Sequence, residues 1–541
     1  MVADRAETYR VKPSAPPTTP TGLDNTAVKS LIDRLCDKLW AAGVTNPITY
    51  VEQISYLVFL KMLDETEADR EREARLSKRP YKPLFAGKNE AFRWSEWTQI
   101  TDTTKLYKFV RDDVFDFMRS LGNRDDVRRF FADAQLQIPD GHTLRDCLDL
   151  FRDFSLSDLD TDIKGDLYEN LLQRLGTQAQ AGQFLTPRHL IRAIVKMVDP
   201  HIGQRILDPA FGTGGFLVAA YEHIKLANSD PKSVVTKING NGQPVSRGYG
   251  DKLSQDQWKF LKQHTFFGFD VDRHIVNLGT MNLVLHDLDR STVERRDSIA
   301  GPADKWDDEQ FDVILANPPF SGSMNTNRIR DCLPVESTKT EILFLGLMIR
   351  ALREGGRCGV IVPEGLLFGA TKSHREIRRK LLTECDVQAV VSFPGGCFKP
   401  YSGVKTSALI FSKPVGRVTS RGGNADAVSG DTAYNGFATK SVWFYEITAD
   451  GFSLDDKRQP TPDKNDFPDL IAKWPKRETS ERSWSATIEQ IQAADFNLTA
   501  GRYKPVTVET VKHDDPKKIL REVTALESEI TDRAGKLLKQ L

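Results

Sequence analysis

The tetrapeptide Asn317-Pro318-Pro319-Phe320 combines groups that suit chemistry on an exocyclic amino group. The lone pair of such a nitrogen is delocalised into its ring or carbonyl, so the nitrogen is a poor nucleophile. Two oxygens, the side-chain oxygen of Asn317 and the carbonyl of Pro318, can accept hydrogen bonds from its N–H groups and favour a nucleophilic geometry. The motif therefore predicts methyl transfer to an amino group, with these residues as the catalytic set.

The prolines and the aromatic residue have physical roles of their own. Pro318 and Pro319 fix φ at both positions and remove backbone donors, so the acceptors are held in place. Phe320 offers a flat apolar face on which an extruded base can stack. Taken alone, the tetrapeptide is equally compatible with a Pro-rich turn after the apolar run 311–316, because a short motif needs its structural context.

A glycine loop lies upstream of this motif. Residues 205–208 predict a short buried strand, and the following PAFGTGG stretch predicts a loop that opens a helix and approaches a ligand closely. The absence of a following Lys-Ser or Lys-Thr disfavours a nucleoside triphosphate loop, and the spacing is not that of a dinucleotide fingerprint. Asp208 suits a ligand with a positively charged amino group, as S-adenosylmethionine has. The residues predicted to bind this cofactor here are Asp208, Gly212, Thr213, Gly214 and Gly215.

A second parallel strand is predicted at residues 265–270, ending in an acid that can bind ribose hydroxyls. Asp270 comes 55 residues after Gly215 (270 − 215), because the polar, Gly-rich stretch 228–262 reads as a surface insertion. An ordinary exposed carboxylate at a strand end is the alternative for Asp270. Asp297 and Ser298 follow another expected strand, where they either contact the adenine ring of the cofactor or form a turn or helix cap.

Further segments follow these motifs in a fixed order, and the chain resembles the modification (M) subunits of type I restriction–modification systems, which are N6-adenine DNA methyltransferases. The resemblance runs from about residue 28 to the C-terminus. The segments that carry it are 182–188 (GQFLTPR), 208–215, 281–286 (MNLVLH), 316–320, 354–357, 360–368, 403–406 (GVKT), Asn497-Leu498 and Arg502-Tyr503.

The resemblance implies an α/β fold: a Rossmann-like S-adenosylmethionine-dependent methyltransferase domain, an α-helical N-terminal domain and a C-terminal helical tail. It also implies double-stranded DNA as substrate, a specificity (S) subunit as partner in a two-to-one complex, and possible association with a restriction or translocase subunit. The segment expected to fold over the cofactor comprises Gln183, Phe184, Leu185, Thr186, Pro187 and Arg188. From the residues alone, Thr186-Pro187 also predicts the capped start of an amphipathic helix.

Two positions depart from the family pattern. Phe211 stands where the family often has a small residue, and it is expected to narrow the pocket near the methionine moiety. Asp270 stands where the family often has Glu, which keeps the charge on a shorter arm. Neither departure removes a catalytic group.

The sequence is also compatible with two other functions. Protein glutamine methyltransferases use a similar Asn-Pro-Pro-aromatic loop, but they lack the 182–188 segment and the C-terminal apolar seam. A non-catalytic cofactor-binding scaffold in a defence complex is the other alternative, and the intact Asp208, Asn317 and Phe320 disfavour it.

Composition and patterning predict the domain organisation. The 541 residues suffice for several domains, and 75 basic against 75 acidic residues give no overall basic field for gripping DNA. A disordered tail is expected at 1–25, an α-helical domain for DNA and subunit contacts at 26–165, the catalytic domain at 166–455, and a C-terminal region at 456–541. Within the last region, apolar residues from Ile519 to Leu541 at three- and four-residue steps predict a partner-binding helix, with docking on the chain's own domain as the alternative.

The remaining patterns address compartment, metals and basic residues. Six cysteines without framework spacing, no signal peptide and no apolar stretch of membrane-spanning length indicate a reduced cytoplasm and no membrane partner. The nine histidines show no metal-ligand spacing, so no metal site is predicted; His189, His264 and His286 are expected on the surface or in packing. The basic run 374–380 is expected to be a solvated helix face, with phosphate contact as the alternative.

Overall fold

The structure of the chain is a computed structural model. It describes residues 25–77, 81–121, 131, 134–152, 171, 186–238, 244–286, 288, 291–300, 310–326, 329, 333–399, 402–416, 436–505 and 516–539. The predicted tail therefore lies outside the described residues except for Asn25, which begins the first helix. Of the segment 416–436, likewise, only the two end residues are described.

All secondary-structure elements among the described residues of the N-terminal part are helices. Its helices are α1 (Asn25–Ala41), α2 (Pro47–Ser77), α3 (Trp94–Trp97), α4 (Thr103–Phe109), α5 (Phe115–Leu121) and α6 (Gly141–Phe151). Aspartates start two of them: Asp102 accepts hydrogen bonds from two backbone N–H groups of α4, and Asp140 does the same for α6. The aromatic residues Trp94, Trp97 and Phe115 are buried in the core of these helices, and Phe109 packs against the same cluster.

A mixed sheet of nine strands forms the centre of the described catalytic region, in the order β13-β10-β8-β9-β7-β6-β1-β4-β5. The strands are β1 (Ile206–Asp208), β4 (Phe266–Asp270), β5 (Thr292–Arg295), β6 (Phe311–Ala316), β7 (Leu352–Pro363), β8 (Asp386–Ser392), β9 (Thr406–Ser412), β10 (Ser441–Glu446) and β13 (Ser483–Thr487). β5, β4, β1, β6 and β7 run parallel, while β9 is antiparallel to both of its neighbours. The strands predicted at 205–208 and 265–270 are present as β1 and β4, and the strand expected before Asp297 is β5.

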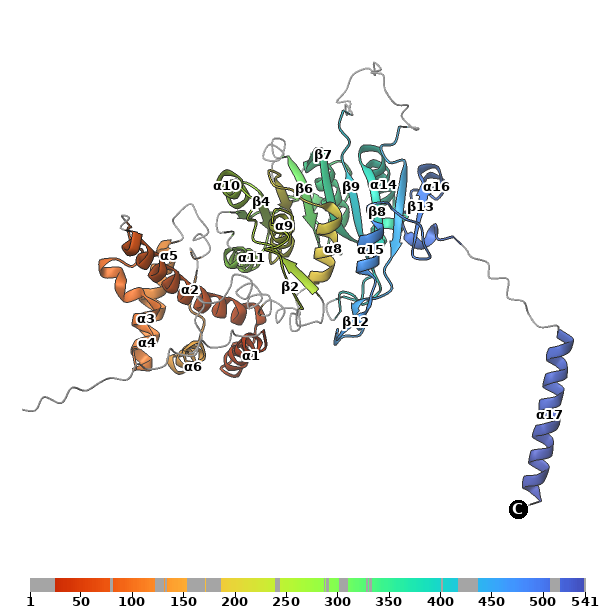
Figure 1. The fold of residues 1–541 in the computed structure, drawn as a ribbon, viewed down its shortest axis with the longest axis horizontal. Helices are drawn as coiled ribbons and strands as arrows, with labels where there is room; N and C mark the ends of the chain where they lie inside the picture. Colours follow the sequence, from red (N-terminus) through yellow and green to blue (C-terminus); the bar gives the residue numbers. More distant parts are fainter. Residues whose placement is uncertain are drawn as a thin grey trace, which may run out of the picture. The chain divides into compact units, whose positions relative to one another are not determined.

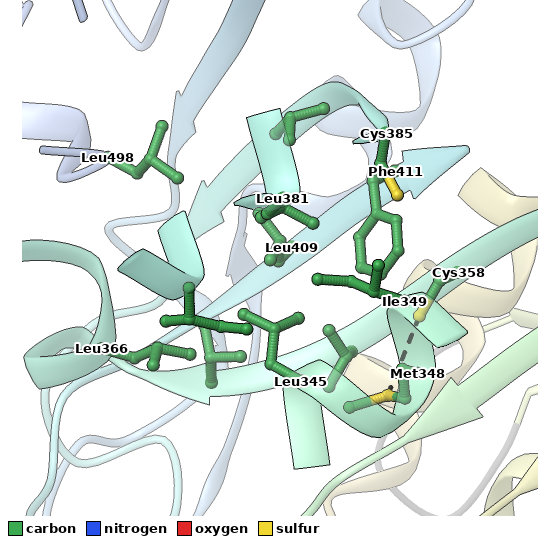
Figure 2. Close-up of a cluster of buried hydrophobic side chains, with 14 of the residues drawn as sticks. Leu345, Met348, Ile349, Cys358, Leu366, Leu381, Cys385, Leu409, Phe411 and Leu498 are labelled. Atoms are coloured by element: carbon green, nitrogen blue, oxygen red, sulfur yellow. Dashed lines mark hydrogen bonds between the residues drawn. The ribbon is translucent and has the colours of Figure 1, made fainter. Parts of the chain in front are cut away.

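Alternating side chains of these strands build two apolar layers. Leu207, Ile314 and Val360 point to the cluster that holds α12 (Thr340–Ala351) and α14 (Lys372–Glu384). Figure 2 shows part of this layer, where residues from α12, α14, β7 and β9 meet around Leu345, Leu381 and Leu409. The neighbouring positions Ile206, Val313 and Ile361 point instead to α8 (Arg188–Val198), α9 (Gly215–Ala227) and α15 (Phe467–Lys473) (Figure 1). Near-continuous burial of both faces is what a parallel sheet covered by helices requires.

One helix belongs to two cores. α11 (Arg273–Leu285) follows β4 and contributes Ile275, Leu278, Met281 and Leu285 to the apolar cluster of the N-terminal helices, where it contacts α2. The same helix contacts β4, β5 and α9 of the sheet region. α11 therefore connects the helical N-terminal part with the sheet region.

The basic run is only partly a solvated face. Arg375 and Arg379 are exposed, but His374 and Arg378 are buried on α14. The guanidinium of Arg378 donates to the backbone oxygens of Leu366 and Gly369 and to those of the 495–496 turn. This cation therefore joins α14 to α13 (Glu364–Phe368), and the expectation of a wholly solvated face is wrong for these two residues.

The remaining described elements lie in the insertion and in the C-terminal region. The insertion at 228–262 contains the hairpin β2 (Val235–Ile238) and β3 (Pro244–Arg247) and helix α10 (Gln255–Gln263). The second hairpin, β11 (Asp450–Phe452) with β12 (Pro460–Asn465), precedes α15, and α16 (Ile488–Ala493) follows β13. Because β13 pairs with β10, the sheet continues beyond residue 455.

The chain divides into two compact units, residues 1–503 and 504–541. The second unit holds α17 (Pro516–Leu538), on which Ile519, Val523, Leu526, Ile530 and Leu537 are all exposed. The predicted C-terminal helix with an apolar seam is therefore present, and its role as a partner-binding element stays a prediction, as do the predicted domain boundaries.

Candidate functional site

The predicted catalytic and cofactor motifs meet at one edge of the sheet. β1 pairs in parallel with β4 on one side and with β6 on the other, so the carboxyl ends of the three strands lie together. Asp208 ends β1, Asp270 ends β4, and Asn317 directly follows β6. Open α/β sheets bind their ligands at this edge.

The glycine loop has the backbone conformation that its sequence predicts. Gly212 (φ 55°) and Gly214 (φ 76°) have positive φ, which favours glycine, and Gly214 precedes the first residue of α9. Oδ2 of Asp270 accepts from the backbone N–H of Gly212 at 2.9 Å, and Oδ1 accepts from Asp272 N–H at 3.0 Å. Asp270 is therefore a half-buried residue fixed beside the loop, and not an ordinary exposed carboxylate.

The loop is also held from α11, by a residue for which the sequence predicted no role. Asn282 is fully buried, and its Nδ2 donates to the carbonyl of Thr213 at 2.8 Å. One turn earlier, an added Cβ at Gly279 would lie 2.6 Å from the carbonyl oxygen of Gly212. The MNLVLH segment shows only an apolar helix with one amide, so the partner of that amide emerges only in the fold.

The expectation for Phe211 is wrong. Its side chain is buried in the apolar core and does not line a pocket near the methionine moiety. Added Cβ atoms at Gly268 and Gly279 would each lie 2.4 Å from the ring, so these glycines provide the space that the ring fills. The large residue in the loop is thus accommodated by small residues on β4 and α11.

Asp208 is a buried carboxyl with few partners. Its Oδ1 accepts from the backbone N–H of Ala210 at 3.1 Å. Burial raises its pKa well above the ordinary value, and the nearby Asp270 carboxylate raises it further; burial also raises the pKa of Asp270. Two carboxyls that are costly to ionise favour a cationic ligand, because a positive charge would stabilise their charged forms.

The catalytic motif places one acceptor in a buried, unpaired position. Nδ2 of the half-buried Asn317 donates to the hydroxyl oxygen of Thr186 at 2.8 Å. Oδ1 of Asn317 is buried and has no hydrogen-bond partner among the described residues. Such an acceptor costs about 1–3 kcal/mol unless a donor reaches it, so the site is prepared for a ligand N–H. Pro318 beside it is buried and Pro319 is exposed.

Phe320 lies against a second aromatic residue that the sequence did not single out. Its ring is 6% exposed and meets Phe398 edge to face, with 5.3 Å between centroids and an interplanar angle of 90°. Phe398 belongs to the turn between β8 and β9, 78 residues further along (398 − 320), so no local pattern indicates the contact. Stacking of a base on Phe320 stays a prediction.

The predicted cover segment is described only from Thr186 onward; Gln183, Phe184 and Leu185 lie outside the described residues. Pro187 is the N-cap of α8, and its side chain makes no capping hydrogen bond. Thr186 therefore does not cap the helix, and its hydroxyl meets Asn317 instead. Arg188 reaches the loop, where its Nη1 donates to the carbonyl of Gly215 at 3.3 Å.

The adjacent residues Asp297 and Ser298 make different contacts. Oδ1 of Asp297 accepts from the backbone N–H groups of Ile299 and Ala300, both at 3.1 Å, which makes it a turn residue. The buried hydroxyl of Ser298 donates to the carbonyl of Pro209 at 2.6 Å, beside the cofactor loop. Their contact with an adenine ring stays a prediction.

The three histidines considered above lie in different environments. His189 Nε2 lies 3.1 Å from Oδ2 of the buried Asp450, and its ring stacks on Phe452; burial lowers its pKa. His286 is also buried, whereas His264 is exposed. Within the ranges the structure describes, no group of three or more His, Cys, Asp or Glu side chains could hold a metal ion, and no helix is long and apolar enough to cross a membrane.

A mixed sheet with parallel strands β5, β4, β1, β6 and β7, a glycine loop after β1, an acid at the end of β4 and Asn-Pro-Pro-Phe after β6 defines a Rossmann-like methyltransferase. Comparison with known proteins agrees. The N-6 DNA Methylase family matches residues 159–514, and the HsdM N-terminal domain family matches residues 28–151. The chain therefore belongs to the N-6 DNA methylase family.

Several relatives are methylase subunits of type I restriction enzymes. The type I restriction enzyme EcoEI methylase subunit of Escherichia coli is 31% identical, over 95% of this chain and 97% of its own length. The EcoKI methylase subunit of Escherichia coli K12 is 28% identical over 87% of this chain and 82% of its own. A chain solved in a study of complex assembly in the type I R-M system is 27% identical with a TM-score of 0.65, covering 95% of this chain and 98% of that one. The type I methyltransferase subunit from Streptococcus thermophilus shares the fold, with a TM-score of 0.65, 17% identity, and coverage of 89% and 100%.

Proposed function

We propose that this protein transfers a methyl group from S-adenosylmethionine to N6 of adenine in double-stranded DNA, as the modification subunit of a type I restriction–modification complex. The observation that carries the proposal is the buried, unpaired Oδ1 of Asn317 at the edge where the glycine loop and Asp270 also lie. Family membership names the chemistry, and this acceptor is the group that the chemistry needs.

The residues at the edge fit the cofactor. The open backbone at Gly212 and Gly214 would hold its methionine part, Asp208 would face its ammonium group, and Asp270 would bind its ribose hydroxyls. Ser298 and Asp297 would border the adenine, and the segment from Gln183 to Arg188 would cover the ligand. When bound, S-adenosylmethionine supplies the electrophilic methyl group.

The chain's own residues act on the target amine. Oδ1 of Asn317 and the carbonyl of Pro318 would each accept one N–H of the adenine amino group, which directs its lone pair toward the cofactor side of the site. Proline at 318 and 319 prevents these acceptors from relaxing away. The target base would leave the duplex and lie against Phe320, at a cost of a few kcal/mol for unstacking. Positioning and electrostatics supply the catalytic effect.

Partners follow from the charge and from the relatives. With 75 basic and 75 acidic residues, the chain has no overall field for DNA, so a partner would supply part of the grip and the sequence readout. We infer a complex of two copies of this chain with one specificity subunit, formed in the cytoplasm, which a restriction or translocase subunit can join. The exposed apolar residues of α17 are the surface that we assign to this assembly.

The substitution Asn317→Ala tests the proposal. It removes the acceptor without touching the glycine loop, so methyl transfer should fall by at least about 100-fold while cofactor affinity stays close to wild type. The measurements are labelled-methyl incorporation at N6 of DNA adenine and calorimetric titration of cofactor, both on the complex with the specificity subunit. Asn228→Ala is the control, since it removes an amide that bonds only within the end of α9. Unchanged activity of Asn317→Ala would show that the assigned chemistry is wrong.

A further inference from the structure

The hydroxyl of Thr186 binds the catalytic amide. Its oxygen accepts the hydrogen bond from Nδ2 of Asn317 at 2.8 Å, although the two residues are 131 apart in sequence. The other end of the same amide, Oδ1, is the buried atom without a partner among the described residues. One end of the amide is thus occupied by the protein, and the other end is left for a ligand.

The direction of this amide decides whether the site can work. An asparagine side chain has a donor end and an acceptor end of nearly equal size. An amino group approaching the site brings N–H donors, so only Oδ1 can bind it. A rotation of the Asn317 amide by 180° would turn Nδ2 toward the N–H groups of the target amine. Two donors would then face each other, and the acceptor that activates the amine would be lost. The productive orientation therefore needs a group that accepts from Nδ2. The hydroxyl oxygen of Thr186 is that acceptor as long as the hydroxyl proton points away from the amide, because a hydroxyl can donate as well as accept.

The position of Thr186 is fixed from both sides of its peptide. Pro187 follows it, which restricts Thr186 to extended backbone conformations. Pro187 is itself the N-cap of α8, with φ −57° and ψ 133°. Arg188 then bonds to the carbonyl of Gly215 at 3.3 Å and ties the segment to the cofactor loop. Asn317 is equally fixed, because it directly follows the buried strand β6.

We propose that Thr186 is a positioning residue for the transfer step: its hydroxyl oxygen holds the Asn317 amide with Oδ1 toward the target amine. This inference rests on the proposed function and deepens it. It differs from a role for Thr186 in cofactor binding alone, because a positioning role changes the rate at saturating cofactor, whereas a cofactor role changes cofactor affinity.

Two variants separate the roles. Thr186→Val keeps the branched shape and replaces the hydroxyl by a methyl group, and Thr186→Ser keeps the hydroxyl. In the complex with the specificity subunit and saturating DNA, Thr186→Val should lower kcat about tenfold, which corresponds to about 1.4 kcal/mol, with the cofactor KM changed by less than about twofold. Thr186→Ser should restore most of the rate. Single-turnover measurements would place the loss in the transfer step.

Matched controls define the outcomes. Thr98→Val removes a hydroxyl that bonds to the carbonyl of Trp94 in the N-terminal helices, and it should leave kcat unchanged. If Thr186→Val did not fold, as judged by thermal unfolding and cofactor titration, Thr186→Ala would serve the same comparison without the added methyl. A wild-type rate for the hydroxyl-free variant, or a raised cofactor Kd with unchanged kcat, would overturn the positioning role. A wild-type complex that methylates no DNA would overturn the proposed function itself.

Discussion

At the scale of single residues, the buried carboxyl of Asp208 affects both the stability of the chain and the predicted binding of the cofactor. The pKa of Asp208 is raised well above 3.8 by burial, so the folded chain holds this proton more tightly than the unfolded chain does. The contribution of Asp208 to folding is therefore most favourable at low pH, and it is lost as pH rises from the unfolded pKa toward the folded one. A bound cation would reverse this by stabilising the carboxylate.

Asp208→Asn should therefore stabilise the cofactor-free chain and weaken the cofactor complex. Asn keeps the acceptor for Ala210 N–H and removes the ionisation cost, so the unfolding midpoint near neutral pH should rise by about 2 °C. In the wild type, cofactor binding should release protons at a pH below the raised pKa of Asp208, and it should tighten as pH rises toward that pKa. Calorimetry in buffers of different ionisation enthalpy measures the release, which the variant should lose. Equal proton release in both proteins would contradict the assignment to Asp208.

The sequence predicted the ends of the strands well, because the signal for each strand end lies within a few consecutive residues. The apolar runs that end in Asp208, Asp270 and Ala316 carry their own boundary signals, and all three end strands at one edge. Side-chain partners across the fold are different. Neither the bond from Asn282 to the Thr213 carbonyl nor the contact of Phe320 with Phe398 has a local signal, because each joins residues about 70 to 80 positions apart. Phe211 was misread for the same reason, since Gly268 and Gly279 come later in the chain.

At the scale of elements, α11 and β4 support the cofactor loop through small residues. The Phe211 ring fills space at Gly268 and Gly279, and the latter also touches the carbonyl of Gly212. These contacts differ in kind. The three atoms nearest to an added Cβ at Gly268 all belong to the ring, whereas those nearest to an added Cβ at Gly279 include the carbonyl oxygen of Gly212. A side chain can be shortened to relieve a clash, but a backbone carbonyl cannot.

The two glycines should therefore respond differently to the same rescue. Gly268→Ala and Gly279→Ala should each destabilise the chain, by about 1–3 kcal/mol for overpacking. Adding Phe211→Leu should recover much of the loss for Gly268→Ala, with a coupling energy of about 0.5–3 kcal/mol, and less for Gly279→Ala. The coupling energy is measured by denaturant unfolding of two double-mutant cycles, one for Gly268 with Phe211 and one for Gly279 with Phe211. Cofactor titration should show weaker binding for Gly279→Ala even with Phe211→Leu present. Equal rescue of both would contradict the contact with Gly212.

At the scale of the whole molecule, the compact unit of residues 1–503 carries the sheet, the site and the N-terminal helices, and residues 504–541 form a unit of their own. Ile519, Val523, Leu526 and Ile530 repeat at steps of four, three and four residues, the spacing of a seam that packs on another helix. We expect this seam to be a binding surface for a helix of a partner.

Removing residues 504–541 should therefore separate assembly from cofactor binding. The truncated chain should keep the unfolding midpoint and cofactor affinity of the full chain, because the site and its supporting cores lie within residues 1–503. It should no longer co-purify with the specificity subunit. In the full chain, the pair Leu526→Asp and Ile530→Asp should have the same effect, since charges on the seam would be buried without partners. Ser528→Asp on the opposite face is the matched control and should assemble normally. Retained assembly of the seam variant, measured by size-exclusion chromatography with light scattering, would show that the subunits meet through another surface.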